Sequence, residues 1–149
     1  MRTLATRRDP FKFAFALVAS WTALGAVPGF LDPRGSFLRF HGHLPESPMV
    51  LELYRGAWGQ TLLFAVGYAF AARDPQRHAL LLLLGAIGKT IYTLRLLGTL
   101  AAGHAAPLTV IAAVGDTLCV TVIVYWLVTR GALRSLVAGA SSVGDPACG

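Results

Sequence analysis

Charged residues are scarce in this chain. Only 13% of its 149 residues are charged, 55% are hydrophobic, and the mean hydropathy is +0.61. Soluble domains of this size carry about a quarter charged residues. The composition therefore argues against an ordinary soluble domain and favours a single domain embedded in a membrane.

Cysteines and recognisable catalytic motifs are also scarce. Cys119 lies in an apolar run and Cys148 in a polar tail, so the two cysteines do not predict a disulfide. No Ser-His-Asp arrangement or nucleophile elbow is visible, and Gly85-x-x-Gly88-Lys89 lacks the spacing of a phosphate loop. The enzyme question stays open at this point, with the expectation that the chain is not an enzyme on its own.

Acidic residues are few beside basic ones, with 7 Asp and Glu against 13 Lys and Arg and a formal net charge of +6. The basic residues flank apolar segments and form no continuous stripe. Flanking positions of this kind report the orientation of membrane helices. We therefore expect a lipid bilayer as the partner and no nucleic acid.

Four apolar runs are long enough to cross a hydrocarbon core of roughly 30 Å, which takes about 20 helical residues. The predicted helices cover about residues 10–30, 48–72, 75–101 and 107–130. The first run follows a basic leader and could also be a secretory signal, but Trp21 in its middle and the three later runs favour a retained helix. We predict an all-α bundle of four transmembrane helices in one domain, residues 1–138, and a disordered cytoplasmic tail, residues 139–149.

Proline marks the expected helix starts. Asp9-Pro10, Ser47-Pro48 and Asp74-Pro75 each place a capping side chain before proline, which is favourable at the first helical position. Pro107 opens the fourth helix in the same way, although Ala106 before it is a poor cap.

The short loops predict the orientation. One side of the membrane receives Arg2, Arg7, Arg8, Lys12, Arg73, Arg77, Arg130 and Arg134, and the other receives Arg34 and Arg39. The positive-inside rule then places both termini in the cytoplasm. Residues 31–48 face outward as a loop, and the alternation of Phe37, Leu38 and Phe40 with Arg39 and His41 predicts that this loop rests on the membrane surface.

Seven polar residues interrupt the last three runs and form the candidate ligand-binding site. They are Glu52, Arg55, Gln60, Lys89, Tyr92, Arg95 and Asp116. Ionisable groups in hydrocarbon cost several kcal/mol unless they face the bundle interior and find partners. At about 1.5 Å of rise per residue all seven lie in the outer half of the membrane, with Lys89 the deepest at roughly 17 Å.

Helical spacing predicts that these residues share one interior. Gly85, Gly88, Lys89, Tyr92, Arg95 and Leu96 recur at steps of three and four on the third helix. We expect Asp116 to pair with Lys89, Arg95 or both, and Glu52 to pair with Arg55. Small residues beside the charges let neighbouring helix backbones approach closely.

Several functions fit such a site. Three positive side chains against two negative ones predict a net-positive pocket for a hydrophobic, anionic or carbonyl-bearing molecule that is lipid-like or quinone-like. A structural ion-pair network meets the same need to neutralise buried charge. The alternatives are an accessory subunit, with a membrane-protein partner or a second copy, and a small proton-coupled transporter that uses Asp116 and Lys89 as a relay.

Histidines offer a weaker signal. His41, His43 and His104 all fall on the outer side, but their spacing is not diagnostic of a metal site. We assign no metal, and whether these three residues bind one stays open.

A few positions resemble a known group. Leu31-Asp32-Pro33, Glu52-x-x-Arg55-x-x-x-Gly59 and Gly88-Lys89 are similar to patterns in the small bacterial four-helix membrane proteins of the DoxX-like group and related families. The resemblance spans the four apolar runs. It implies a four-helix fold in the bacterial cytoplasmic (inner) membrane. Because DoxX members are similar to subunits associated with quinone-linked sulfur oxidation, it also implies a quinone as the one cofactor or ligand to consider.

Overall fold

The protein is all-helical in its computed structural model, which describes residues 9–103 and 106–132. The described residues form α1 (Pro10–Leu31), α2 (Pro33–His41), α3 (Pro48–Arg73), α4 (Ala79–Ala101) and α5 (Pro107–Thr129), with no strand. The predicted all-α class is confirmed, and the predicted tail lies outside the described residues.

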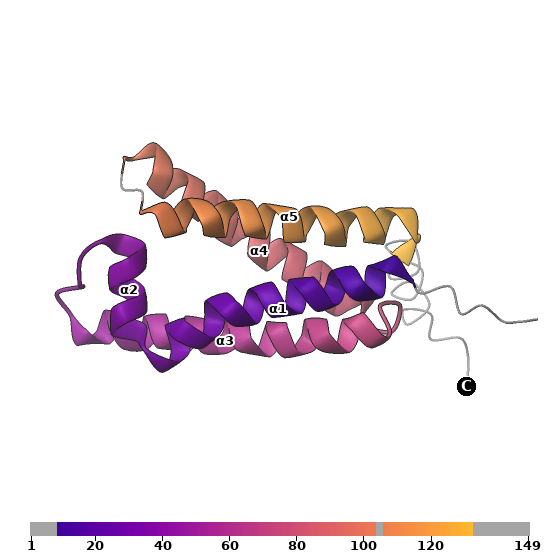
Figure 1. Ribbon diagram of the computed structural model, residues 1–149, viewed down its shortest axis with the longest axis horizontal. Helices are drawn as coiled ribbons and strands as arrows, with labels where there is room; N and C mark the ends of the chain where they lie inside the picture. The colour runs from indigo at the N-terminus through magenta and orange to yellow at the C-terminus, as the bar shows by residue number, and fades with distance from the viewer. Residues whose placement is uncertain (1–8, 104–105, 133–149) are drawn as a thin grey trace, which may run out of the picture.

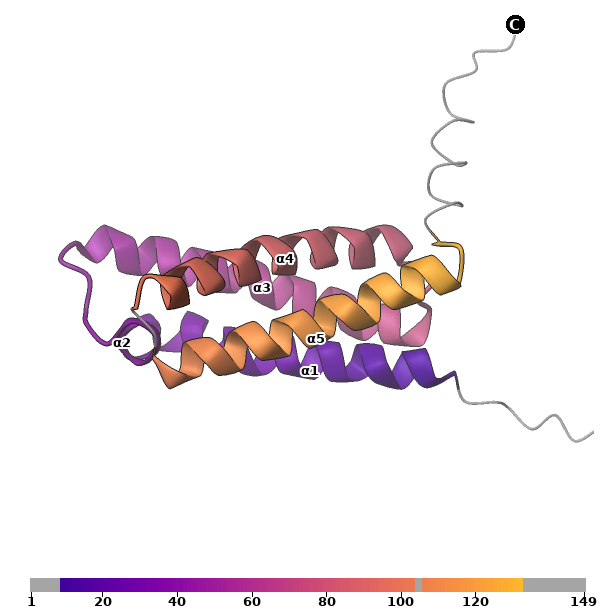
Figure 2. The same ribbon diagram turned by 90° about the horizontal axis from the view of Figure 1, so that it is seen from above.

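The four long helices run side by side, and α2 lies across one end of them (Figure 1). Figure 2 shows α2 nearly end-on in the perpendicular view. Helix α1 packs chiefly against α3 and α4 chiefly against α5, while the two pairs share fewer contacts. We call the end with α2 the α2 end. The opposite end, where α1 begins, α3 gives way to α4 and α5 finishes, is the α3–α4 end.

The Asp-Pro signals act as predicted at α1 but not at α4. Asp9 accepts a hydrogen bond from the backbone N–H of Phe11 at 3.1 Å and caps α1. Asp74 instead ends α3, and its carboxylate accepts from the backbone N–H of Arg77 at 3.2 Å. That bond closes a separate turn over residues 75–78, so α4 begins at Ala79 and the predicted start at residue 75 is wrong.

The segment predicted as an outer loop contains α2, so that prediction is corrected. Asp32 caps α2 by accepting from the backbone N–H of Gly35 at 2.9 Å, and Pro33 follows at the first helical position. Gly42 ends the helix with φ +74°, a left-handed conformation that glycine adopts without a steric penalty. Asp32-Pro33 is the same signal that opens α1, and its presence predicts this helix.

Hydrogen bonds attach α2 to the bundle. The Ser36 hydroxyl lies 3.2 Å from the Tyr54 hydroxyl of α3. Thr109, near the start of α5, donates from its hydroxyl to the backbone carbonyl of Phe40 at 3.2 Å. Helix α2 is therefore joined to two of the long helices and is a fixed part of the fold.

A packed apolar core fills the half of the bundle toward the α3–α4 end. Phe15, Leu82, Ile123 and Trp126 are almost completely buried there. The rings of Phe15 and Trp126 meet edge to face with their centroids 5.4 Å apart, a favourable arrangement for aromatic pairs. The polar residues of interest therefore lie between this core and α2.

Three helices, α1, α4 and α5, are long and apolar enough to cross a membrane. Helix α3 is longer, at 26 residues, but it carries Glu52, Arg55, Gln60 and Arg73, which lower its hydropathy. Because α3 packs along α1, it covers the same length of the bundle (Figure 1). The protein is thus a helical membrane-protein candidate with three strongly apolar helices.

We expect Asp32→Ala to loosen α2 specifically. Loss of the capping acceptor costs a helix about 1 kcal/mol, and the 3.7 Å contact between Asp32 and Arg39 is lost with it. Amide hydrogen exchange over residues 33–41 should become about fivefold faster, since about 1 kcal/mol corresponds to that ratio. Asp32→Ser, which keeps an acceptor, should exchange nearly as slowly as the wild type, and equal rates in all three proteins would contradict the capping role.

Candidate functional site

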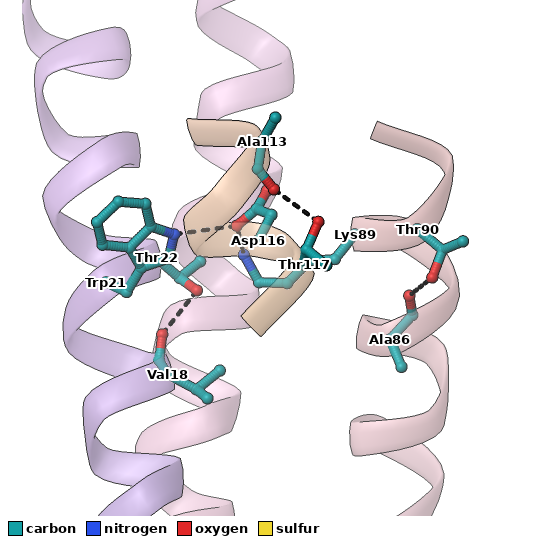
Figure 3. A network of polar contacts seen from close by, with 9 residues as sticks. All are labelled: Val18, Trp21, Thr22, Ala86, Lys89, Thr90, Ala113, Asp116 and Thr117. Atoms are coloured by element: carbon teal, nitrogen blue, oxygen red, sulfur yellow. Dashed lines mark hydrogen bonds and ion pairs between the residues drawn. The ribbon is translucent and has the colours of Figure 1, made fainter. Parts of the chain in front are cut away.

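A buried ion pair with a second hydrogen-bond donor to its carboxylate occupies the middle of the bundle (Figure 3). Lys89 Nζ of α4 lies 2.5 Å from Asp116 Oδ1 of α5. Trp21 Nε1 of α1 donates to the same oxygen at 3.1 Å. Each of the three residues lies close to the midpoint of its helix. We call these three residues the Lys89–Asp116–Trp21 cluster, and it confirms the predicted pairing of Asp116 with Lys89.

Burial makes this cluster a strong constraint on the fold. The side chains of Lys89 and Asp116 are only 10% and 9% exposed. Removing both charges from water carries a penalty of several kcal/mol per ion, which short contact and additional hydrogen bonds offset. Trp21 supplies such a bond, so the carboxylate is held by a cation and by a neutral donor from separate helices.

Glycines let the aromatic partners come close. A Cβ at Gly115, next to Asp116, would overlap the six-membered ring of Trp21, so only glycine leaves room for the indole. In the same way, a Cβ at Gly85, one turn before Lys89, would overlap the Tyr68 hydroxyl. Small residues near the charges were predicted to let helix backbones approach, and at these two positions they admit an aromatic side chain of another helix.

Hydroxyl groups around the cluster divide into two kinds. Thr22, Thr90 and Thr117 donate to the carbonyls of Val18, Ala86 and Ala113 on their own helices (Figure 3). The hydroxyl of Thr93, one turn from Lys89 toward the α2 end, is buried and has no hydrogen-bond partner among the described residues. Buried polar groups are nearly always paired, so this exception calls for an explanation.

The other predicted site residues do not join the cluster. Glu52 and Arg55 form the predicted pair at 3.6 Å, with Glu52 exposed and Arg55 partly buried. Gln60 and Arg95 are exposed on the outside of the bundle, as is Gly88. Gly88 and Arg95 therefore do not belong to the interior face of α4, contrary to prediction. Of the seven candidate site residues, only Lys89 and Asp116 meet in the interior.

Tyr92 belongs to a different group of side chains. Its ring centroid lies 6.3 Å from that of Trp58, which lies 5.8 Å from Tyr54. Tyr54 in turn lies 5.2 Å from Phe37 of α2. We call these four residues the aromatic cluster. It extends from α2 to Tyr92, which is next to Thr93 in the sequence.

Sequence reasoning missed two participants. Trp21 was read only as a residue of an apolar helix, yet a tryptophan N–H that is buried usually finds an acceptor, and Asp116 was the acceptor at matching depth. Thr93, four residues after Lys89, was missed because nothing in the sequence distinguishes it from the threonines that bond to their own helices.

His41 and His43 are exposed at the α2 end. His43 Nδ1 lies 2.9 Å from the backbone carbonyl of His41, and burial together with neighbouring His43 lowers the pKa of His41 below its ordinary value. No group of three or more metal-ligating side chains occurs in residues 9–103 and 106–132. His104 lies outside the described residues.

Comparison with known proteins adds no relative. No family model, curated protein or solved structure matches this chain. The resemblance to the DoxX-like group stays a prediction from the sequence.

Proposed function

We propose that this chain is a four-helix protein of the bacterial cytoplasmic membrane, with α3 as the fourth span and both termini on the cytoplasmic side. Helix α3 packs along α1, so α3 crosses the bilayer together with α1 in this proposal. Of the basic residues in the described loops and helix ends, Lys12, Arg73, Arg77 and Arg130 lie toward the α3–α4 end, and Arg34 and Arg39 lie in α2. The positive-inside rule assigns the first group to the cytoplasm. The bacterial membrane is taken from the DoxX-like resemblance.

The proposal continues with a ligand: a lipid-like or quinone-like molecule bound between the Lys89–Asp116–Trp21 cluster and the aromatic cluster. One observation carries it, the buried hydroxyl of Thr93 that has no partner among the described residues. A hydroxyl in that setting is a donor suited to a carbonyl oxygen. In this proposal the rings of Tyr92 and Trp58, which meet edge to face with centroids 6.3 Å apart, contact the apolar rest of such a molecule.

Charge at this site supports a neutral or weakly polar ligand better than a strongly anionic one. Lys89 is already paired with Asp116, and Arg55 is paired with Glu52. Of the three positive side chains that were expected to make the pocket net positive, Lys89 and Arg55 are therefore neutralised by a carboxylate. A quinone carbonyl or an ester carbonyl of a lipid fits this balance.

Transport is the weaker alternative. A proton-coupled carrier needs a polar route from the cluster to both membrane faces. Phe15, Leu82, Ile123 and Trp126 fill the interior on the way to the α3–α4 end. That packed apolar half speaks against a proton path through it.

The ligand proposal is tested with Thr93→Val. We expect the detergent-extracted protein to bind a short-chain benzoquinone or a phospholipid, as measured by native mass spectrometry and by titration. Loss of one hydrogen bond of about 1 kcal/mol should weaken that binding about fivefold to tenfold. The matched control is Thr90→Val, because the Thr90 hydroxyl already donates to Ala86 on the same helix at 2.8 Å.

Two results would contradict this proposal. Equal affinities of Thr93→Val and Thr90→Val would remove Thr93 from the site. If the wild-type protein neither carries nor binds either probe, while its fold is retained, the cluster is structural, and the accessory-subunit alternative takes its place.

A further inference from the structure

The outward side of α3 carries an amide at the middle of the helix. Gln60 is exposed and lies near the midpoint of Pro48–Arg73. For its side chain no hydrogen bond occurs within the part of the chain that the structure describes. An amide left in hydrocarbon without a partner costs several kcal/mol.

Exposed hydroxyls on the other helices avoid this penalty. Each donates to the backbone carbonyl four residues earlier on its own helix; these residues are Ser20, Thr90, Thr117 and Thr121. A glutamine amide has two donor hydrogens and one acceptor oxygen, more than a single backbone carbonyl satisfies. Gln60 therefore needs a polar partner from outside the described bundle.

The residues around Gln60 follow the pattern of a helix–helix seam. Met49, Leu53, Gly56, Gln60 and Leu63 succeed one another at steps of four and three. Leu53 is 67% exposed and Leu63 is 73% exposed. A Cβ at Gly56 would meet no atom within 4 Å, so a second helix can approach there. This spacing is that of helices that pair with a left-handed crossing.

We propose that two copies of this chain pair along this α3 seam, with the two Gln60 amides hydrogen-bonded to each other across a two-fold axis. A two-fold axis parallel to the helices brings identical residues together at the same depth. An amide both donates and accepts, so it is its own complement, and a single polar residue in a seam fixes the register of the pair. This inference rests on the membrane placement proposed above and not on the ligand.

The seam also has a defined extent. At Gly67, where the pattern would continue toward the α3–α4 end, Leu81 of α4 occupies the space that a Cβ would take. The crossing of the two α3 helices therefore centres on residues 53–63. In such a dimer Gln60, one of the polar residues that lower the hydropathy of α3, faces protein and not lipid.

The first test measures the oligomeric state of the full-length protein. We expect a dimer in mild detergent by analytical ultracentrifugation, and Gln60→Leu should raise its dissociation constant about tenfold, the effect of one interhelical polar contact. Thr117→Val, which removes an exposed hydroxyl already bonded to its own helix, should leave dimerisation unchanged. A monomeric wild-type protein, or equal dissociation constants for the two variants, would overturn the pairing.

The second test locates the seam in native membranes without altering Gln60. In a background with Cys119→Ala and Cys148→Ser, single Leu53→Cys and Leu63→Cys variants should form disulfide-linked dimers on oxidation. Leu118→Cys on α5, which is 63% exposed near the middle of its helix, should not. Preferential cross-linking at residue 118, or capture of a different protein at residues 53 and 63, would overturn pairing with a second copy. Recovery of all three variants in the carbonate-resistant membrane fraction separates that result from a failure of membrane insertion.

Discussion

Lys89→Met is expected to destabilise the bundle by about 3–5 kcal/mol, the usual result of removing one partner of a buried ion pair. The methionine fills much of the lysine volume, so the loss comes from Asp116, whose carboxylate is left with Trp21 as its neutral donor. The unfolding of the purified protein in mixed detergent micelles, followed by circular dichroism against denaturing detergent, measures this change.

A double substitution separates the pair from the packing around it. Asp116→Asn keeps an acceptor for Trp21 but leaves Lys89 as a buried cation without its counter-charge. Lys89→Met with Asp116→Asn removes both charges, so it should be more stable than either single variant, because no unpaired charge remains. If each single variant lowers the free energy of unfolding by less than about 0.5 kcal/mol, as is typical of exposed positions, the pair is not a buried one.

Much of the fold was predictable because its signals are local. Apolar runs of sufficient length, with Pro10, Pro48 and Pro107 at the first helical position, gave the four long helices to within a residue or two, apart from the start of α4. Helix α2 was overlooked because a loop between two spans was assumed to lack structure. Its own capping signal, Asp32-Pro33, was present in the sequence.

The site was only partly predictable. The position of a residue in the sequence gives its depth along the helix, but the side of the helix that faces the bundle interior depends on packing against other helices. Lys89 and Asp116 were paired from helical spacing and depth, and the contact is present. Gln60 and Arg95 have suitable depths too, but they point outward because α1 packs on α3 and α5 packs on α4. Which helix covers which face is decided by tertiary packing, for example by the fit of Trp21 at Gly115.

Because Trp21 packs so closely on Gly115, we expect Gly115→Ala to lower the stability of the bundle strongly. The added methyl group overlaps the Trp21 ring, and overpacking of this kind costs about 1–3 kcal/mol. Moving the ring also breaks its hydrogen bond to the Asp116 carboxylate, and a bond to a charged group contributes about 1.5–3 kcal/mol. The two losses arise from one displacement, so the total should reach about 3 kcal/mol or more in the same unfolding measurement.

Gly88→Ala is the matched control for this prediction. Gly88 lies near the middle of α4 and a Cβ there meets no atom within 4 Å, so alanine should be neutral or stabilise the helix by about 0.5–1 kcal/mol. In a Trp21→Phe background the smaller ring leaves room for a methyl group, and Gly115→Ala should then cost less than it does beside the indole. Equal effects of Gly115→Ala in both backgrounds would show that the contact between Trp21 and Gly115 does not hold α1 against α5.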